Sequence, residues 1–196
     1  FSRMSNYSRI LELHELAVGE GRRMARQRKL LDPLLADRGK HFAGIAGPRG
    51  AGKTILLRQL AASDSSAVYL SADTLDKNTD LFEVARDLAE RYQFNKLLVD
   101  EIHFLDDWQA GLKRIYDFLE IRVVFTSSVA LALHAASHDL ARRVKLRQLD
   151  YFSFAEFLEF RYGKTIEPLS LDDLLDGSWQ AEHLRSERHF AEYLEG

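Results

Sequence analysis

The sequence predicts an α/β fold in three layers, in which a mostly parallel sheet is covered by helices on both faces. Two observations lead to this prediction. Short apolar runs alternate along the chain with segments whose apolar residues recur every three or four positions, and such alternation is typical of a parallel sheet. A glycine-rich loop, residues 47–54, also lies between one apolar run and one helical segment. Both observations indicate one sizeable core with helical segments before and after it.

The composition fits a packed protein and argues against disulfides, thiolate metal sites and membrane spans. The chain has 196 residues, of which 46% are apolar, and this size suits one domain with small additions. It contains no cysteine, which excludes disulfides and thiolate metal sites and leads us to expect a cytoplasmic protein. No apolar run approaches the roughly 20 residues of a membrane span, so we expect no membrane partner. The net charge of −3 argues against whole-chain attraction to nucleic acid, although local basic clusters leave that partner open.

Residues 1–38 are expected to form an N-terminal helical segment. Apolar residues recur at helical spacing between residues 7 and 36. Gly19 and Gly21 are predicted to break this stretch into two pieces, and Pro33 suits the first turn of a helix.

Residues 39–152 are expected to form the core. Its predicted strands are residues 41–46, 67–70, 96–100 and 121–125, with a short fifth strand at 144–149. Its predicted helices are residues 54–62, residues 81–92, and one that begins after Asp106 or Asp107.

Residues 153–196 are expected to be a helical tail. Ser153 and Glu156 have the spacing of a capping box, which indicates the start of a helix.

The loop after the first predicted strand has the sequence of a phosphate-binding motif. Its residues match the pattern G-x-x-x-x-G-K-[ST] and are Gly47, Pro48, Arg49, Gly50, Ala51, Gly52, Lys53 and Thr54. Glycines let the backbone turn tightly and present N–H groups to a phosphate, and the following helix start favours an anion. Lys53 adds a mobile ammonium for the β- and γ-phosphates, while the Thr54 hydroxyl can bind Mg²⁺. We therefore predict a P-loop NTPase core that binds nucleotide through this loop and the adjoining Ile55.

Two acidic residues end the third predicted strand. Asp100 is expected at the carboxyl edge of a strand neighbouring that of the loop, where it would bind Mg²⁺, mostly through water. Glu101 follows and can polarise an attacking water as general base. Hydroxyl groups of Thr126 and Ser128, which end the fourth strand, are candidates for contact with the γ-phosphate or the water. No guanine-specificity segment is present in the expected order, so ATP is preferred over GTP.

A basic cluster follows the fourth strand. Arg142, Arg143, Lys145 and Arg147 lie close together in the sequence. A solvated basic face is the ordinary interpretation of such a cluster. An arginine there could instead stabilise transition-state charge, either within the chain or across a subunit boundary. Arg143 is the favoured candidate, and this hypothesis leaves an oligomer open.

Several separated segments have a pattern in common with one known group. They are Asp100-Glu101-Ile102-His103 with Trp108, Val124-Phe125-Thr126-Ser127-Ser128, Leu140-Ala141-Arg142-Arg143 and Phe152-Ser153-Phe154-Ala155-Glu156-Phe157-Leu158. In this order they resemble prokaryotic AAA+ type ATPase domains related to the archaeal ATPase and STAND/MNS lineages, over about residues 25–160. His103 stands where that group usually has Gln, Ser127 and Arg142 where it has Gly, and Tyr151-Phe152 where it has Pro-Leu.

The resemblance implies ATP and Mg²⁺ as cofactors and hydrolysis with Glu101 as the water-activating residue. It also implies that the tail, residues 153–196, leads into a C-terminal domain, so that an attached domain or a partner protein would respond to the nucleotide. Two alternatives remain at this point. One is a binding or scaffold module that nucleotide regulates with little turnover. The other is a small-molecule kinase, against which Glu101 counts because a kinase needs no activated water.

Overall fold

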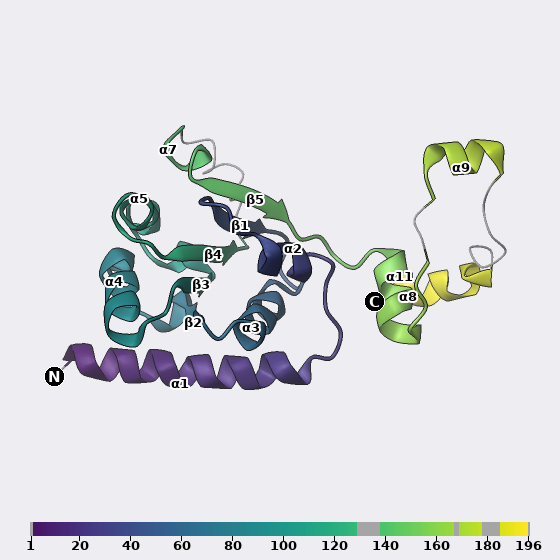
Figure 1. Cartoon of the computed structure of the whole chain (residues 1–196). Helices are drawn as coiled ribbons and strands as arrows, with labels where there is room; N and C mark the ends of the chain where they lie inside the picture. The colour runs from purple at the N-terminus through teal and green to yellow at the C-terminus, as the bar shows by residue number, and fades with distance from the viewer. Residues whose placement is uncertain (1, 129–137, 167–168, 178–184, 196) are drawn as a thin grey trace. The chain divides into compact units, whose positions relative to one another are not determined.

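The computed structural model describes residues 2–128, 138–166, 169–177 and 185–195 (Figure 1). The chain divides into two compact units, residues 1–149 and 150–196. The N-terminal helical segment, residues 1–38, belongs to the first unit because its long helix packs along the core. The boundary before the tail falls after Leu149 rather than after residue 152.

The first unit is built on a five-stranded sheet. Its strands are β1 (Phe42–Ala46), β2 (Ala67–Ser71), β3 (Lys96–Asp100), β4 (Arg122–Ser127) and β5 (Val144–Gln148). The order across the sheet is β2-β3-β4-β1-β5, and every neighbouring pair is parallel (Figure 1). The predicted parallel sheet is therefore confirmed. One expectation was wrong: β3 does not neighbour β1, because β4 lies between them.

Helices cover both faces of this sheet, which confirms the three layers (Figure 1). One face carries α2 (Leu31–Ala36) and α3 (Lys53–Ser63), and the other carries α4 (Leu81–Tyr92) and α5 (Trp108–Phe118). Shorter turns are η1 (Ala72–Thr74) and η2 (Ile102–Phe104), which follow β2 and β3, and α7 (His138–Ala141), which precedes β5.

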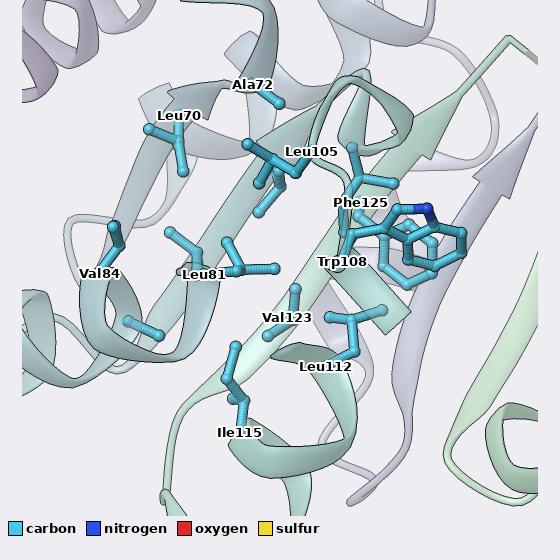
Figure 2. Close-up of a cluster of buried hydrophobic side chains, with 14 of the residues drawn as sticks. Leu70, Ala72, Leu81, Val84, Leu105, Trp108, Leu112, Ile115, Val123 and Phe125 are labelled. Carbon is cyan, nitrogen blue, oxygen red and sulfur yellow. The ribbon is translucent and has the colours of Figure 1, made fainter. Parts of the chain in front are cut away.

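The packing beneath α4 and α5 explains why these segments fold as they do. Figure 2 shows apolar side chains of both helices meeting those of β2 and β4. Leu97 and Val99 of β3 belong to the same cluster. Trp108, at the start of α5, packs against Phe125 of β4 with ring centroids 5.9 Å apart. Full burial of an aliphatic side chain contributes about 1.5–3 kcal/mol. This layer therefore fixes the ends of β3 and β4 firmly in place.

The first helix, α1 (Ser2–Arg23), is continuous, so the predicted break at Gly19 and Gly21 was wrong. Gly21 has a packing role instead. A Cβ atom there would lie 2.1 Å from the carbonyl oxygen of Arg58 in α3. Only glycine permits so close an approach of the two helices, and this gain outweighs the modest helix-propensity cost of about 1 kcal/mol.

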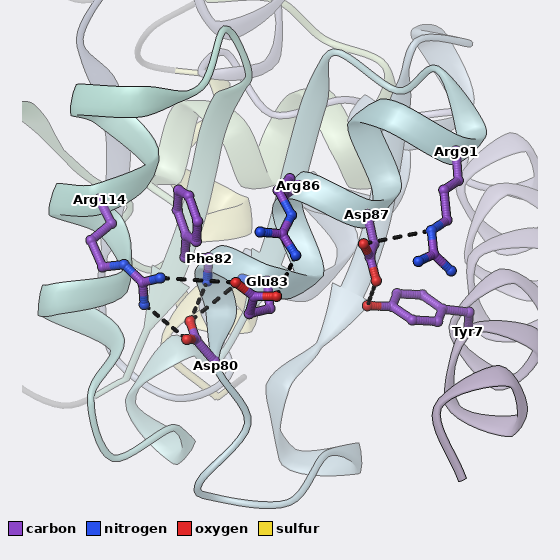
Figure 3. A network of polar contacts seen from close by, with 8 residues as sticks. All are labelled: Tyr7, Asp80, Phe82, Glu83, Arg86, Asp87, Arg91 and Arg114. Carbon is purple, nitrogen blue, oxygen red and sulfur yellow. Dashed lines mark hydrogen bonds and ion pairs between the residues drawn. The ribbon is translucent and has the colours of Figure 1, made fainter. Parts of the chain in front are cut away.

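A polar network joins α1, α4 and α5 (Figure 3). Tyr7 of α1 donates its hydroxyl to Asp87 Oδ2 of α4 at 2.7 Å, and Asp87 is only 5% exposed. Asp80 caps α4 by accepting from two backbone amides and also pairs with Arg114 of α5 at 2.8 Å. Asp107 does occupy the N-cap position of α5, as predicted, but its side chain makes no capping bond.

The second unit contains α8 (Phe154–Tyr162), α9 (Leu171–Asp176), η3 (Glu187–His189) and α11 (Phe190–Glu195). The predicted capping box at the start of α8 is confirmed, with Ser153 and Glu156 bonding reciprocally. Aromatic rings of α8 and α11 pack together, Phe154 against Phe190 at 5.2 Å between centroids. Among the described residues, no helix combines the length and the apolar character that a membrane crossing requires.

Candidate nucleotide and metal site

The glycine-rich loop joins β1 to α3, and its geometry explains why glycine occupies three of its positions. Gly50 and Gly52 adopt φ angles of 84° and 90°, in the left-handed region that favours glycine. Gly47 packs against the end of β5, where a Cβ atom would lie 2.0 Å from the carbonyl oxygen of Leu149. The loop therefore has the backbone shape that the motif predicts.

Two buried cations hold the loop. Lys53 Nζ donates to the carbonyl oxygens of Gly47 and Pro48, both at 2.9 Å, so its ammonium lies within the loop. Arg28, from the segment between α1 and α2, donates to the carbonyl oxygen of Ala51 at 2.7 Å and is 8% exposed. A phosphate would offer Lys53 a charged acceptor, which forms a stronger hydrogen bond than a neutral carbonyl does.

Asp100 lies at the carboxyl end of β3, 3% exposed, and both of its carboxylate oxygens accept a hydrogen bond. Tyr69 of β2 donates to Oδ2 at 2.9 Å, and Thr126 of β4 donates to Oδ1 at 2.5 Å. Burial, together with the neighbouring Asp100 carboxylate, raises the pKa of Tyr69, so the phenol keeps the proton that it donates. Each carboxylate oxygen has a second lone-pair direction through which it can accept a further bond.

Thr126, near the end of β4, contacts both acidic residues. It is fully buried, with 0% of its surface exposed, and its hydroxyl also accepts from the backbone amide of Glu101 at 2.9 Å. Its hydroxyl is thus engaged by Asp100 and Glu101, and contact between Thr126 and a nucleotide stays a prediction. Thr126 holds the two acidic residues in position.

Glu101 has an unusual backbone, with φ at 50° in the left-handed region. Its carboxylate turns towards the end of β4, where Oε2 accepts from the amide and hydroxyl of Ser128 at 3.1 and 3.0 Å. His103 Nδ1 lies 3.3 Å from the same oxygen and 3.1 Å from the hydroxyl of Ser127. A non-glycine residue in this region costs of order 1–3 kcal/mol, and such strain is concentrated at functional sites.

One cleft brings these groups together. It has a volume of about 610 Å³ and is lined by Thr54 and Arg49 of the loop region, by Asp100 and Glu101, and by Ser128. Its remaining walls come from α3, the end of β2 and the two short turns, with the side chains of Arg58, Tyr69, Ser71, Asp73, His103 and Phe104. Five residues predicted from separate parts of the sequence thus face one space.

The residues of this cleft fit a magnesium-bound triphosphate. The hydroxyl of Thr54 and the carboxylate of Asp100 are hard oxygen ligands of the kind that Mg²⁺ takes. Within the described part of the chain, no group of three or more histidine and acidic side chains forms a ready-made metal site.

The remaining nucleotide candidates lie in the same loop or just after it. Ala51 is buried, and its backbone amide lies 3.3 Å from the carbonyl oxygen of Pro48 within the loop. Ile55, in the first turn of α3, is 40% exposed and so can form an apolar contact with a ligand.

The structure does not bring Arg143 to this cleft. Arg143 precedes β5, and its carbonyl oxygen accepts from the amide of Phe42, at the start of β1. The loop begins at the other end of β1, about 13 Å away at 3.3 Å per residue. Its guanidinium pairs with Asp117 at 3.0 Å. This geometry therefore gives no support to a catalytic role of Arg143 within its own chain, and a role across a subunit boundary stays a prediction.

Three residues of the site were not found from the sequence: Tyr69, Arg58 and Arg28. Arg58 follows Thr54 by four positions, a spacing that puts both on one helix face, so this residue could have been found. Tyr69 lay within a correctly predicted strand, but nothing in the sequence gives the order of the strands. Arg28 carried no signal that separated it from its basic neighbours.

Comparison with known proteins agrees with this geometry. A family model described as an AAA domain matches residues 40–158, which is more than half of the chain. The chain belongs to the AAA-domain family. The strands and the cleft described above lie within the matched AAA domain, whereas α1 and Arg28 precede it. The resemblance noted in the sequence is thereby confirmed, and with it a nucleotide-binding, ATPase-like class of domain.

The AAA domain also has a relative in an archaeon. An uncharacterized protein of Methanocaldococcus jannaschii is 30% identical over 161 residues, which cover 76% of this chain. The matched part is 34% of that protein, so the chain spans about a third of the length of its relative.

Proposed function

We propose that this AAA domain binds ATP with Mg²⁺ and hydrolyses it, and that hydrolysis drives a conformational change in an attached or partner domain. The observation that carries the proposal is the shared cleft, which is lined by Thr54 together with Asp100 and Glu101. The topology supports it as well, because parallel strands present their carboxyl ends at one edge of the sheet, where nucleotides bind.

Each residue has a defined task in this proposal. Backbone amides of the loop and the ammonium of Lys53 bind the β- and γ-phosphates. Thr54 and Asp100 hold Mg²⁺, which when bound neutralises phosphate charge. Glu101 accepts a proton from the attacking water, and its contacts with Ser128 and His103 set its orientation.

A second candidate function has its own support. The Glu101 oxygen Oε2 already accepts two hydrogen bonds from Ser128, and the buried hydroxyl of Thr126 is engaged by Asp100 and the Glu101 amide. Such an arrangement favours a module that binds ATP with little turnover and changes its loops in response. It shares the binding half of the proposal and differs only in the chemical step.

The test is ATP binding and phosphate release by the purified chain, with Mg²⁺ or with EDTA and without any acceptor. Lys53→Ala should abolish ATP binding, because the loop loses the cation that it encloses. Lys113→Ala, which alters an exposed lysine on α5, is the matched control and should bind normally. Unchanged ATP affinity in Lys53→Ala would overturn the proposed site.

The same assay separates the alternatives. Steady phosphate release supports hydrolysis, whereas tight ATP binding with negligible release supports the regulated module. Formation of ADP only when a small-molecule acceptor is added would support the kinase interpretation instead.

A further inference from the structure

Tyr69 connects three parts of the first unit at the buried side of the cleft. It belongs to β2, and the residue two positions later, Ser71, pairs in register with Asp100 of β3. Its ring packs in the cluster beneath α3 and is 3% exposed, and its hydroxyl donates to Asp100 Oδ2 at 2.9 Å. The guanidinium carbon of Arg58 lies 5.9 Å from the centre of the ring.

The backbone of Tyr69 is fixed as well. Its amide donates to Nδ1 of His14 in α1 at 3.1 Å, in a buried hydrogen bond. Arg58, on the other side of the ring, forms an ion pair with Glu20 of α1. Side chain and backbone of Tyr69 are thus both held by contacts that include a helix outside the matched AAA domain.

The bonds to Asp100 determine which way its carboxylate faces. With Tyr69 donating to one oxygen and Thr126 to the other, rotation of the carboxylate plane would break a hydrogen bond to a charged group. Groups that hydrogen-bond a metal ligand and fix its orientation typically change metal affinity by about 10- to 100-fold.

We propose that Tyr69 is the positioning residue for the metal-binding carboxylate of Asp100. The inference rests on the proposed function, since it assumes that Asp100 binds Mg²⁺ or its waters. Tyr69 acts through Asp100, to which its hydroxyl donates. It fixes the plane of Asp100, so that the remaining lone pairs face the cleft.

The test uses Tyr69→Phe, which keeps the ring and removes only the donor. Mn²⁺ binding in the presence of ADP is followed by electron paramagnetic resonance of the free ion, and ADP binding is measured separately in EDTA. We expect the half-saturating Mn²⁺ concentration to rise by about 10-fold or more. Metal-free ADP affinity should stay within twofold of the wild type. Tyr92→Phe, on the exposed side of α4, is the control and should change neither value.

A double-mutant cycle separates positioning from general destabilisation. In an Asp100→Asn background, Tyr69→Phe should have no further effect on Mn²⁺ binding, because its effect passes through that carboxylate. An unchanged Mn²⁺ requirement in Tyr69→Phe, or equal losses in metal-free and metal-bound ADP affinity, would overturn this inference alone. Failure of the wild-type chain to bind ADP at all would overturn the proposed function and this inference with it.

Discussion

Replacement of Glu101 by glutamine separates the two candidate functions most directly. The wild-type carboxylate accepts hydrogen bonds from the amide and hydroxyl of Ser128 at 3.1 and 3.0 Å. A glutamine amide has the same shape and keeps one oxygen that can accept both. The change therefore removes the proton-accepting group and leaves the local structure in place.

The expected changes in turnover, stability and ATP affinity follow from the loss of the carboxylate. Loss of a general base slows turnover by about 10²–10⁴-fold, which corresponds to about 2.7–5.4 kcal/mol at 1.36 kcal/mol for each tenfold change. Weakening of the charged hydrogen bonds costs at most about 1.5 kcal/mol of stability, so the melting temperature should fall by less than about 6 °C. Affinity for ATP should change less than twofold, because Glu101 does not contact the loop.

Phosphate release under saturating Mg²⁺ and ATP, with ATP binding measured in parallel, checks this prediction. Glu90→Gln, an exposed change on α4, is the control and should turn over normally. Turnover of Glu101→Gln within threefold of the wild type would refute Glu101 as the base. Negligible turnover of the wild type itself would instead favour the regulated module.

Three further predictions concern the supports of the site. Burial lowers the pKa of His14 from 6.5, so the neutral ring stabilises the fold fully above pH 6.5. That stability should be lost as the pH falls below this value, by up to about 1.4 kcal/mol per pH unit, in urea titrations of the wild type but not of His14→Gln. Tyr7→Phe leaves the buried carboxylate of Asp87 without its 2.7 Å donor, and calorimetry should show a loss of about 1.5–3 kcal/mol that Tyr92→Phe does not share. Arg28→Ala removes the bond to the Ala51 carbonyl, and ATP affinity in a fluorescence titration should fall about tenfold, or about 1.4 kcal/mol. Arg26→Ala, whose side chain is exposed, should bind ATP normally, and equal affinities in these two variants would contradict a role for Arg28 in holding the loop.

The fold could be predicted where the signal was local. Apolar runs gave all five strands, and the spacing of Ser153 and Glu156 gave the start of α8, because these features depend only on residues near one another. Gly21 was misinterpreted because its role depends on α3, which lies far along the chain. A glycine within a helical stretch predicts a break in the helix, unless one knows which helix packs against it.

The site shows the same limit. The loop residues, Asp100 and Glu101 could be predicted because they belong to short sequence motifs, which depend only on neighbouring residues. The surroundings of Thr126 and Arg143 could not be predicted, because the order of the strands decides which side chains reach the cleft. Insertion of β4 between β1 and β3 makes Thr126 a buried link, and the direction of β5 carries Arg143 to the opposite end of the sheet.

The hydrogen bond from the Tyr69 amide to His14 also has a consequence for association between chains. β2 is an edge strand, and edge amides invite strands from other molecules to pair with them. By occupying one such donor and lying along β2, α1 blocks unwanted strand addition on this side. The other edge, β5, carries Lys145 and Arg147, whose charges oppose pairing of a further strand with this edge. The helix α1, which contacts Tyr69 at the site, thus also opposes aggregation through the edge of β2.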